Sequence, residues 1–146
     1  MKTLVSHSIK ETSEIANNWL KDLTSKYEAS GEAVLAGLSG HLGAGKTAFV
    51  KEVAKGLGVK EEITSPTFVI MKIYKTNHSR WHRLVHIDAY RLEKREELEV
   101  LRFEDVMADP HNLVMIEWPE NVHLKKSDLT ERLVLEIRDG MHSISM

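Results

Sequence analysis

The stretch Gly40-His41-Leu42-Gly43-Ala44-Gly45-Lys46-Thr47 decides the fold of this chain. It matches the pattern G-x-x-x-x-G-K-[ST], in which glycines let successive backbone N–H groups turn inward on phosphate oxygens. The lysine of such a loop reaches the β and γ phosphates, and the final hydroxyl binds Mg²⁺. The helix that follows points its positive end at the same anion. The sequence therefore predicts a site for a nucleoside triphosphate and Mg²⁺.

The residues on either side of this loop supply the context that the motif requires. Ala33–Leu38 is a short apolar run, typical of a strand buried on both faces of a parallel sheet. Thr47–Leu57 carries apolar residues at helical spacing, and Gly58 stands where a helix usually ends. The expected nucleotide-binding residues are Gly40, Leu42, Gly43, Ala44, Gly45, Lys46, Thr47 and Ala48.

Further strands and helices are expected on both sides of this unit. Ser8 and Glu11 have the spacing of a capping box, so a helix should begin there and carry an apolar face to about Leu23, before a polar linker over Thr24–Glu32. A second helix is expected over Glu93–Met107, which is rich in helix formers. The expected strands are Thr3–Ser6, Phe68–Tyr74, Leu84–Asp88, Leu113–Ile116 and Arg132–Arg138. Of these, we expect the last to be half exposed near a sheet edge, and the second and third to form a hairpin.

Length and composition limit the class of protein. The chain has 146 residues, and we expect one domain over residues 1–146. Hydrophobic residues make up 42% and charged residues 29%, the balance of a globular protein with a packed core. The net charge of −2 argues against a protein that mainly grips nucleic-acid backbones, so any RNA contact should be local or made through a partner.

Compartment and redox chemistry can also be predicted. The chain contains no cysteine, which excludes disulfides and thiolate metal ligands. The stretch Met1–Ser8 lacks the apolar core of a signal peptide, and no apolar run is long enough to span a bilayer. We therefore expect a cytoplasmic protein without a membrane anchor.

Two acidic residues are candidates for the metal and water side of the reaction. Asp88 follows the apolar run Leu84–Ile87, and Glu117 follows the run Leu113–Ile116. A phosphate loop needs an acidic partner at the end of a neighbouring strand, and strand position alone does not choose between these two. One is expected to hold Mg²⁺ while the other orients the attacking water. The alternative for either carboxylate is a simple capping role.

Two other segments carry polar residues of the types that contact phosphate or bind metal ions. Hydroxyl groups in Thr64–Phe68 could approach the γ-phosphate as a switch segment does, although the pattern alone favours a proline turn before the next strand. The segment His78–Arg83 is predicted to form the tip of a hairpin. His82 and His86 lie four residues apart, which in a strand is about 13 Å and too far for one metal ion, so a zinc site is not expected.

Taken together, four motifs resemble the TsaE (YjeE) family of small bacterial ATPases of tRNA threonylcarbamoyladenosine biosynthesis. They are G-x-L-G-A-G-K-T at Gly40–Thr47, S-P-T-F at Ser65–Phe68, H-x-D-x-Y-R-L at His86–Leu92 and E-W-P at Glu117–Pro119. They occur in the family's order, and the similarity spans about Ser8–Glu120, which is most of the chain. Four ordered motifs are far more specific than the phosphate loop alone.

The resemblance implies a fold and an activity. The fold would be α/β, a P-loop NTPase-like three-layer arrangement with a mostly parallel central sheet and helices on both faces. The activity would be Mg²⁺-dependent ATP hydrolysis, weak unless partners assist. By the same resemblance, Lys46 and Thr47 hold phosphate and Mg²⁺, Glu117 is the second Mg²⁺ position, Asp88 is the water-activating acid and Thr67 lies in the switch-like segment.

The resemblance also implies partners. These are two proteins of actin/Hsp70-like fold, the catalytic threonylcarbamoyltransferase subunit and its inactive paralogue. Together they modify adenosine 37 of tRNAs that read codons beginning with A, and ATP turnover by the small ATPase would reset that complex. Contact with tRNA is expected only through the complex.

Three features refine the resemblance. His41 stands where the family usually has Asp or Asn, and we expect its side chain to point away from the phosphates so that nucleotide binding is retained. The family's adenine pocket involves the start of the first helix, here around Ile9–Thr12. Trp118 lies next to Glu117 and is expected to report nucleotide binding.

Two other functions remain open at the level of sequence. A small-molecule kinase would use Asp88 as the base for an acceptor hydroxyl, but only about 30 residues follow Ile116, which is little chain for a lid and an acceptor pocket. A binding module gated by ATP without hydrolysis overlaps with the favoured interpretation. A GTPase is disfavoured because the chain has no N-K-x-D and no D-x-x-G segment.

Overall fold

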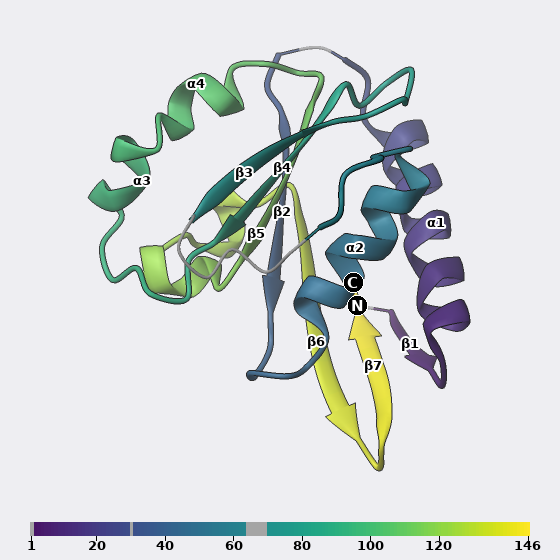
Figure 1. Ribbon diagram of the computed structural model, residues 1–146. Helices are drawn as coiled ribbons and strands as arrows, with labels where there is room; N and C mark the ends of the chain where they lie inside the picture. The colour runs from purple at the N-terminus through teal and green to yellow at the C-terminus, as the bar shows by residue number, and fades with distance from the viewer. Residues whose placement is uncertain (1, 30, 64–69) are drawn as a thin grey trace.

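A computed structural model of the chain describes residues 2–29, 31–63 and 70–146, and over these residues it forms one seven-stranded sheet (Figure 1). The strands are β1 Thr3–Ser6, β2 Val34–Ser39, β3 Met71–Lys75, β4 Arg83–Asp88, β5 Asn112–Glu117, β6 Glu131–Arg138 and β7 Met141–Ser145. Their order in the sheet is β1-β7-β6-β2-β5-β4-β3. The four strands β6, β2, β5 and β4 run parallel, and antiparallel pairings extend the sheet on both sides.

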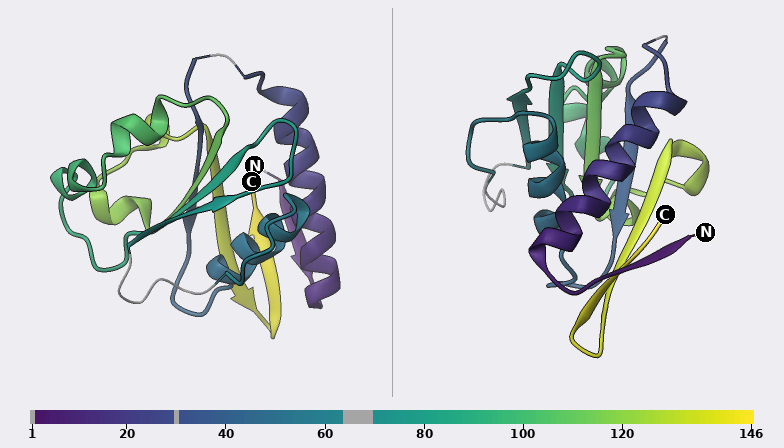
Figure 2. Two further views of the ribbon diagram at one scale, coloured as in Figure 1. Left: turned by 45° about the horizontal axis from the view of Figure 1, so that its top comes forward. Right: turned by 90° about the vertical axis from the view of Figure 1, so that its right-hand side faces the viewer.

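Helices cover both faces of this sheet. They are α1 Ile9–Lys26, α2 Lys46–Gly56, α3 Glu96–Val100, α4 Phe103–Met107 and the 3₁₀ turns η1 Pro119–Val122 and η2 Lys126–Asp128. The helices α1 and α2 pack on one face, where Trp19 and Phe49 meet edge to face with ring centroids 5.7 Å apart. A second apolar cluster on the other face joins α3, α4 and η1 to the sheet. Figure 2 shows α1 and α2 in front of the sheet from one side. This is the predicted three-layer fold.

The first helix begins as predicted and ends later. The Ser8 side chain accepts a hydrogen bond from the backbone N–H of Glu11 at 3.1 Å, and the Glu11 carboxylate reaches back to the N–H of His7 at 2.7 Å. The helix continues through Thr24 to Lys26, so the predicted linker is shorter than expected. The Thr24 hydroxyl explains this extension, because it donates to Leu20 O and accepts from the indole of Trp81, which leaves it satisfied inside the helix.

The prediction that Arg132–Arg138 is half exposed is confirmed, since only Leu133 and Leu135 of this strand are buried, but its predicted position near a sheet edge is wrong. The strand β6 lies third from one edge, between β2 and β7. The β7 strand was not predicted because Met141–Ser145 is only five residues long and three of its side chains are polar. It folds back on β6 through Asp139 and Gly140, both with positive φ, and β1 then pairs with it so that the chain ends lie together (Figure 2).

The single helix predicted over Glu93–Met107 is also wrong. The segment forms two short helices, and the break falls at Arg102, whose φ of 57° is left-handed and ends α3 before α4 begins. Leu98 of α3 and Val106 of α4 are both buried against the sheet. A residue in the left-handed conformation cannot continue a right-handed helix, so the helix propensity of the flanking residues does not join α3 to α4.

The remaining predictions of strands and of the helix after the phosphate loop agree with the structure where it describes them. The strands β3 and β4 form the expected hairpin, with residues 76–82 as its tip, and β3 begins at Met71 while Phe68 and Val69 lie outside the described residues. The helix α2 ends at Gly56 with Leu57 as its C-cap and Gly58 next. Within the described ranges, the helices are all too short or too polar to cross a membrane.

Candidate functional site

The phosphate loop, residues 40–47, joins the end of β2 to the first turn of α2. Two of its glycines are required by its geometry. Gly40 has a φ of 148°, and a Cβ there would lie 2.3 Å from the carbonyl oxygen of Leu135 in β6. Gly45 is the N-cap of α2 and has a left-handed φ of 98°. The loop is therefore pressed against β6 at one end and turned sharply into the helix at the other.

Lys46 lies inside this loop and is only 5% exposed. Its ammonium donates to the carbonyl oxygens of Gly40 at 2.6 Å and His41 at 2.9 Å, and it lies 4.2 Å from the centroid of the Trp118 ring. Burial lowers the pKa of Lys46, and three nearby carboxylates oppose that shift. The buried ammonium thus has carbonyl and aromatic neighbours but no direct anionic partner within the described residues, which suits it to receive a phosphate.

Two carboxylates meet at the ends of neighbouring parallel strands. The register aligns Leu38 of β2 with Glu117 of β5, and Glu117 in turn with Asp88 of β4. The Thr47 hydroxyl donates to the Glu117 carboxylate, at 3.0 Å from Oε2 and 3.1 Å from Oε1. Parallel pairing therefore places both predicted acids in one row at the carboxyl edge of the sheet, beside the start of α2.

Asp88 has an altered proton affinity. Burial is the main cause that raises the pKa of Asp88, and the negative charge of Glu117 adds to it. A hydrogen bond from the Tyr90 N–H to Asp88 Oδ1, 3.0 Å long, acts in the opposite direction. A carboxylate with a raised pKa accepts a proton more readily at neutral pH, which is the property that a general base needs.

Glu117 has a further partner that sequence patterns did not reveal. The imidazole of His86 lies with Nε2 2.6 Å from Glu117 Oε2, and both side chains are buried, with exposures of 0% and 3%. His86 precedes Asp88 by two residues in β4, so both side chains point to the α2 face of the sheet.

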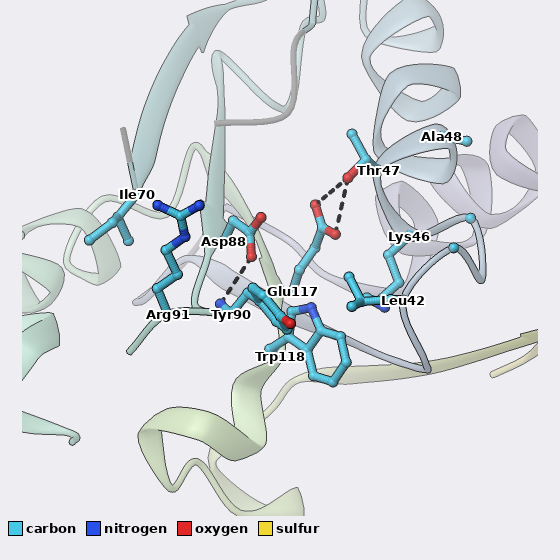
Figure 3. Close-up of a pocket in the computed structure, with 12 residues that line it drawn as sticks. Leu42, Lys46, Thr47, Ala48, Ile70, Asp88, Tyr90, Arg91, Glu117 and Trp118 are labelled. Carbon is cyan, nitrogen blue, oxygen red and sulfur yellow. Dashed lines mark hydrogen bonds between the residues drawn. The ribbon is translucent and has the colours of Figure 1, made fainter. Parts of the chain in front are cut away.

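These side chains surround a cavity of about 420 Å³ (Figure 3). Its lining residues are Leu42, Gly43, Gly45, Lys46, Thr47, Ala48, Ile70, Asp88, Tyr90, Arg91, Glu117 and Trp118. The structure thus brings together most of the predicted site. Gly40 and Ala44 support the loop from behind, and the exposed His41 takes part through its carbonyl oxygen. Thr67 lies outside the described residues.

A second cavity of about 500 Å³ lies on the other side of the loop. It is formed by the start of α1, including Ile9 and Thr12, by Gly45 and Ala48, and by His142 of β7. This is the neighbourhood in which the family resemblance places the adenine. His142 was not anticipated as a site residue because its strand was not predicted, although the Asp-Gly pair before it is a strong hairpin signal.

The donor set fits Mg²⁺ bound together with a nucleotide. The described residues contain no group of three or more acidic, histidine or cysteine side chains able to hold a metal ion. Thr47 and Glu117 instead offer two adjacent oxygen donors. Mg²⁺ usually takes one or two protein ligands and completes its octahedron with phosphate oxygens and water. The arrangement therefore suits a metal that arrives with its triphosphate.

Comparison with known proteins places the chain in a family. The family model for the threonylcarbamoyl adenosine biosynthesis protein TsaE matches residues 6–143. The chain belongs to the TsaE family. A TsaE protein from Treponema pallidum is 38% identical over 110 residues, which cover 75% of this chain and 78% of that protein. The TsaE family takes part in tRNA threonylcarbamoyladenosine biosynthesis, and the chain shares that assignment.

Other relatives support the same assignment. A TsaE protein from Rickettsia bellii is 35% identical over 133 residues, covering 90% of this chain and 87% of that protein. One from Streptomyces coelicolor is 42% identical over 102 residues, covering 68% and 65% respectively. The crystal structure of YdiB from Bacillus subtilis superposes with a TM-score of 0.64 at 26% identity, over 98% of this chain and 82% of that one. The TsaE family assignment thus agrees with the fold.

Proposed function

We propose that this chain is a Mg²⁺-dependent ATP hydrolase that drives a nucleotide switch in tRNA threonylcarbamoylation. The observation that carries the proposal is the convergence of Lys46, Thr47, Asp88 and Glu117 on one cavity at the start of α2. Each of these groups has the chemistry that phosphoryl transfer to water requires, and each comes from an element whose position the parallel sheet fixes.

In ATP hydrolysis, the chain's own residues would have separate roles. The Lys46 ammonium moves from the carbonyl oxygens of Gly40 and His41 to the β and γ phosphates. Bound Mg²⁺ would neutralise charge that develops on the phosphate oxygens, held by the Thr47 hydroxyl and the Glu117 carboxylate. Asp88 accepts the proton of the attacking water as its oxygen bonds to the γ-phosphorus and ADP departs. Thr67 is proposed to contact the same phosphate from the switch-like segment.

The proposed place of this hydrolysis is a complex. The pathway assignment, together with the family resemblance, supports action on the catalytic threonylcarbamoyltransferase subunit and its inactive paralogue, both of actin/Hsp70-like fold. Turnover would reset that complex between rounds of modification of adenosine 37. The net charge of −2 favours tRNA contact through the complex rather than through this chain alone.

Phosphate release from Mg²⁺-ATP tests the proposal. We expect slow release by the chain alone and a marked increase when the two partner proteins are added. The Lys46→Ala variant should abolish the increase, whereas Lys21→Ala, at an exposed position on α1, should leave it unchanged. Binding without release under any condition would indicate a gated binding module instead. Release of ADP with phosphorylation of an added alcohol would indicate a kinase.

A further inference from the structure

The His86 side chain has an environment that packing alone does not explain. It is fully buried in the middle of β4, at a position where its register partner in β5 is the apolar Met115. Its Nε2 approaches Glu117 Oε2 at 2.6 Å, while its Nδ1 is buried and has no hydrogen-bond partner in the part of the chain that the structure describes. Burying this polar ring with only one hydrogen-bonded nitrogen costs free energy of folding, so the contact with Glu117 calls for a functional reason.

The hydrogen-bond pattern assigns the donor nitrogen of this ring. An ionised carboxylate only accepts hydrogen bonds, so Nε2 must carry the hydrogen. The His86 Nε2 is therefore the donor in this contact, and Glu117 Oε2 is the acceptor.

We propose that His86 is a positioning residue that aims the Glu117 carboxylate at the metal position. The inference rests on the proposed function, since it assumes that Glu117 serves Mg²⁺. The carboxylate is held from two sides, by the Thr47 hydroxyl from α2 and by the His86 ring from β4. With the ring in place, Glu117 stays turned toward Thr47 when the hydroxyl turns to the metal. Hydrogen bonds of this kind fix metal-binding side chains in one orientation and typically change metal affinity by about 10- to 100-fold.

Three substitutions at this position separate positioning from packing. His86→Leu removes the donor and keeps an apolar side chain. His86→Asn keeps an amide that is too short to reach Glu117, and His86→Gln places an amide N–H near the position of Nε2. We expect the Mg²⁺ concentration that gives the half-maximal gain in ATP affinity to rise about 10- to 100-fold in the Leu and Asn variants. The Gln variant should restore it to within a few fold of the unsubstituted protein.

The control is Met115→Ala, which weakens the same layer of the core and leaves the side chains of His86 and Glu117 in place. It should lower thermal stability and leave the Mg²⁺ midpoint unchanged. Calorimetric titration of ATP in EDTA should give the same affinity for all four variants, because the hydrogen bond acts only through the metal. The ¹⁵N spectrum of the His86 ring, identified by its loss in His86→Gln, should show a hydrogen bonded to Nε2.

Several outcomes would overturn the inference. One is an unchanged Mg²⁺ midpoint in His86→Asn, and another is an equal rise in the Asn and Gln variants; both comparisons hold even if His86→Leu does not fold. A ring whose Nε2 carries no hydrogen would also overturn it. If the unsubstituted protein gains no ATP affinity from Mg²⁺, then the metal assignment of the proposed function is wrong and the inference falls with it, which distinguishes the two failures.

Discussion

Gly40→Ala is predicted to damage both the stability and the site of this protein. The new Cβ would lie 2.3 Å from the carbonyl oxygen of Leu135, whereas real Cβ atoms essentially never approach such an atom within 3.0 Å. Neither partner can yield easily. Leu135 is buried and its backbone pairs with Ile144 in β7, and Gly40 is held between β2 and the phosphate loop.

The cost has two parts that can be estimated separately. A residue with a side chain at a φ of 148° is strained by about 1–3 kcal/mol. Forcing an extra carbon into a packed contact adds about 1–3 kcal/mol. We therefore expect the free energy of unfolding to fall by about 2–6 kcal/mol, the sum of these two ranges. ATP affinity should also fall about tenfold or more, because a shift of the loop by about 1 Å misplaces Lys46 and Thr47.

Gly31→Ala is the matched control for the backbone part of the cost. Gly31 also has a positive φ, 84°, but a Cβ there would have no atom of the described residues within 4 Å. Its expected cost is the conformational part alone, about 1–2 kcal/mol, with ATP affinity unchanged. Urea unfolding followed by circular dichroism gives both free energies, and calorimetry gives the affinities. If Gly40→Ala cost no more than Gly31→Ala, the steric argument would be refuted.

Five further outcomes are expected. Asp88→Asn should abolish phosphate release yet raise the melting temperature at neutral pH. The melting temperature rises because folding raises the pKa of Asp88 and so disfavours its ionised form. The difference in melting temperature from the unsubstituted protein should shrink as the pH falls through that raised pKa. Phosphate release should likewise decline on acidification at a pH above the ordinary range of an aspartate. Thr47→Ala should reduce Mg²⁺-dependent release more than ATP affinity, measured by stopped assays and calorimetry, and normal release would contradict the metal assignment. ATP should change the fluorescence of Trp118 by drawing Lys46 from its ring, and Trp118→Phe should remove that change, because the other tryptophans are buried away from the cavity. Arg80→Leu should lower the free energy of unfolding by about 2–3 kcal/mol in urea titrations. The reason is that Arg80 donates hydrogen bonds to three loop carbonyls and stacks 3.7 Å from the centroid of the Trp81 ring. An unchanged urea midpoint would mean that these contacts contribute nothing to stability.

The parts of the fold that the sequence predicted correctly depend on local rules. The phosphate loop needs glycines at fixed positions, the Ser8 cap needs a hydroxyl at the first turn, and the buried strands need continuous apolar runs. Each rule involves residues within about one turn or one strand of each other, so the pattern is visible in the chain itself. The same holds for Asp88 and Glu117, since a strand end is a local feature and parallel strands end at the same edge of a sheet.

The tertiary structure decided what depends on neighbours distant in sequence. Arg102 breaks a helix that local propensity favours, and the two short helices on either side each bury one side chain, Leu98 and Val106, on the sheet. The β6 strand lies inside the sheet because a polar strand, β7, pairs beside it. The contact between His86 and Glu117 joins residues 31 positions apart, and its chemistry follows from complete burial. The sequence by itself determined that a phosphate loop is present and which acids face it. Only the fold fixed how those acids are held, because burial and hydrogen-bond partners are properties of packing and not of any single segment.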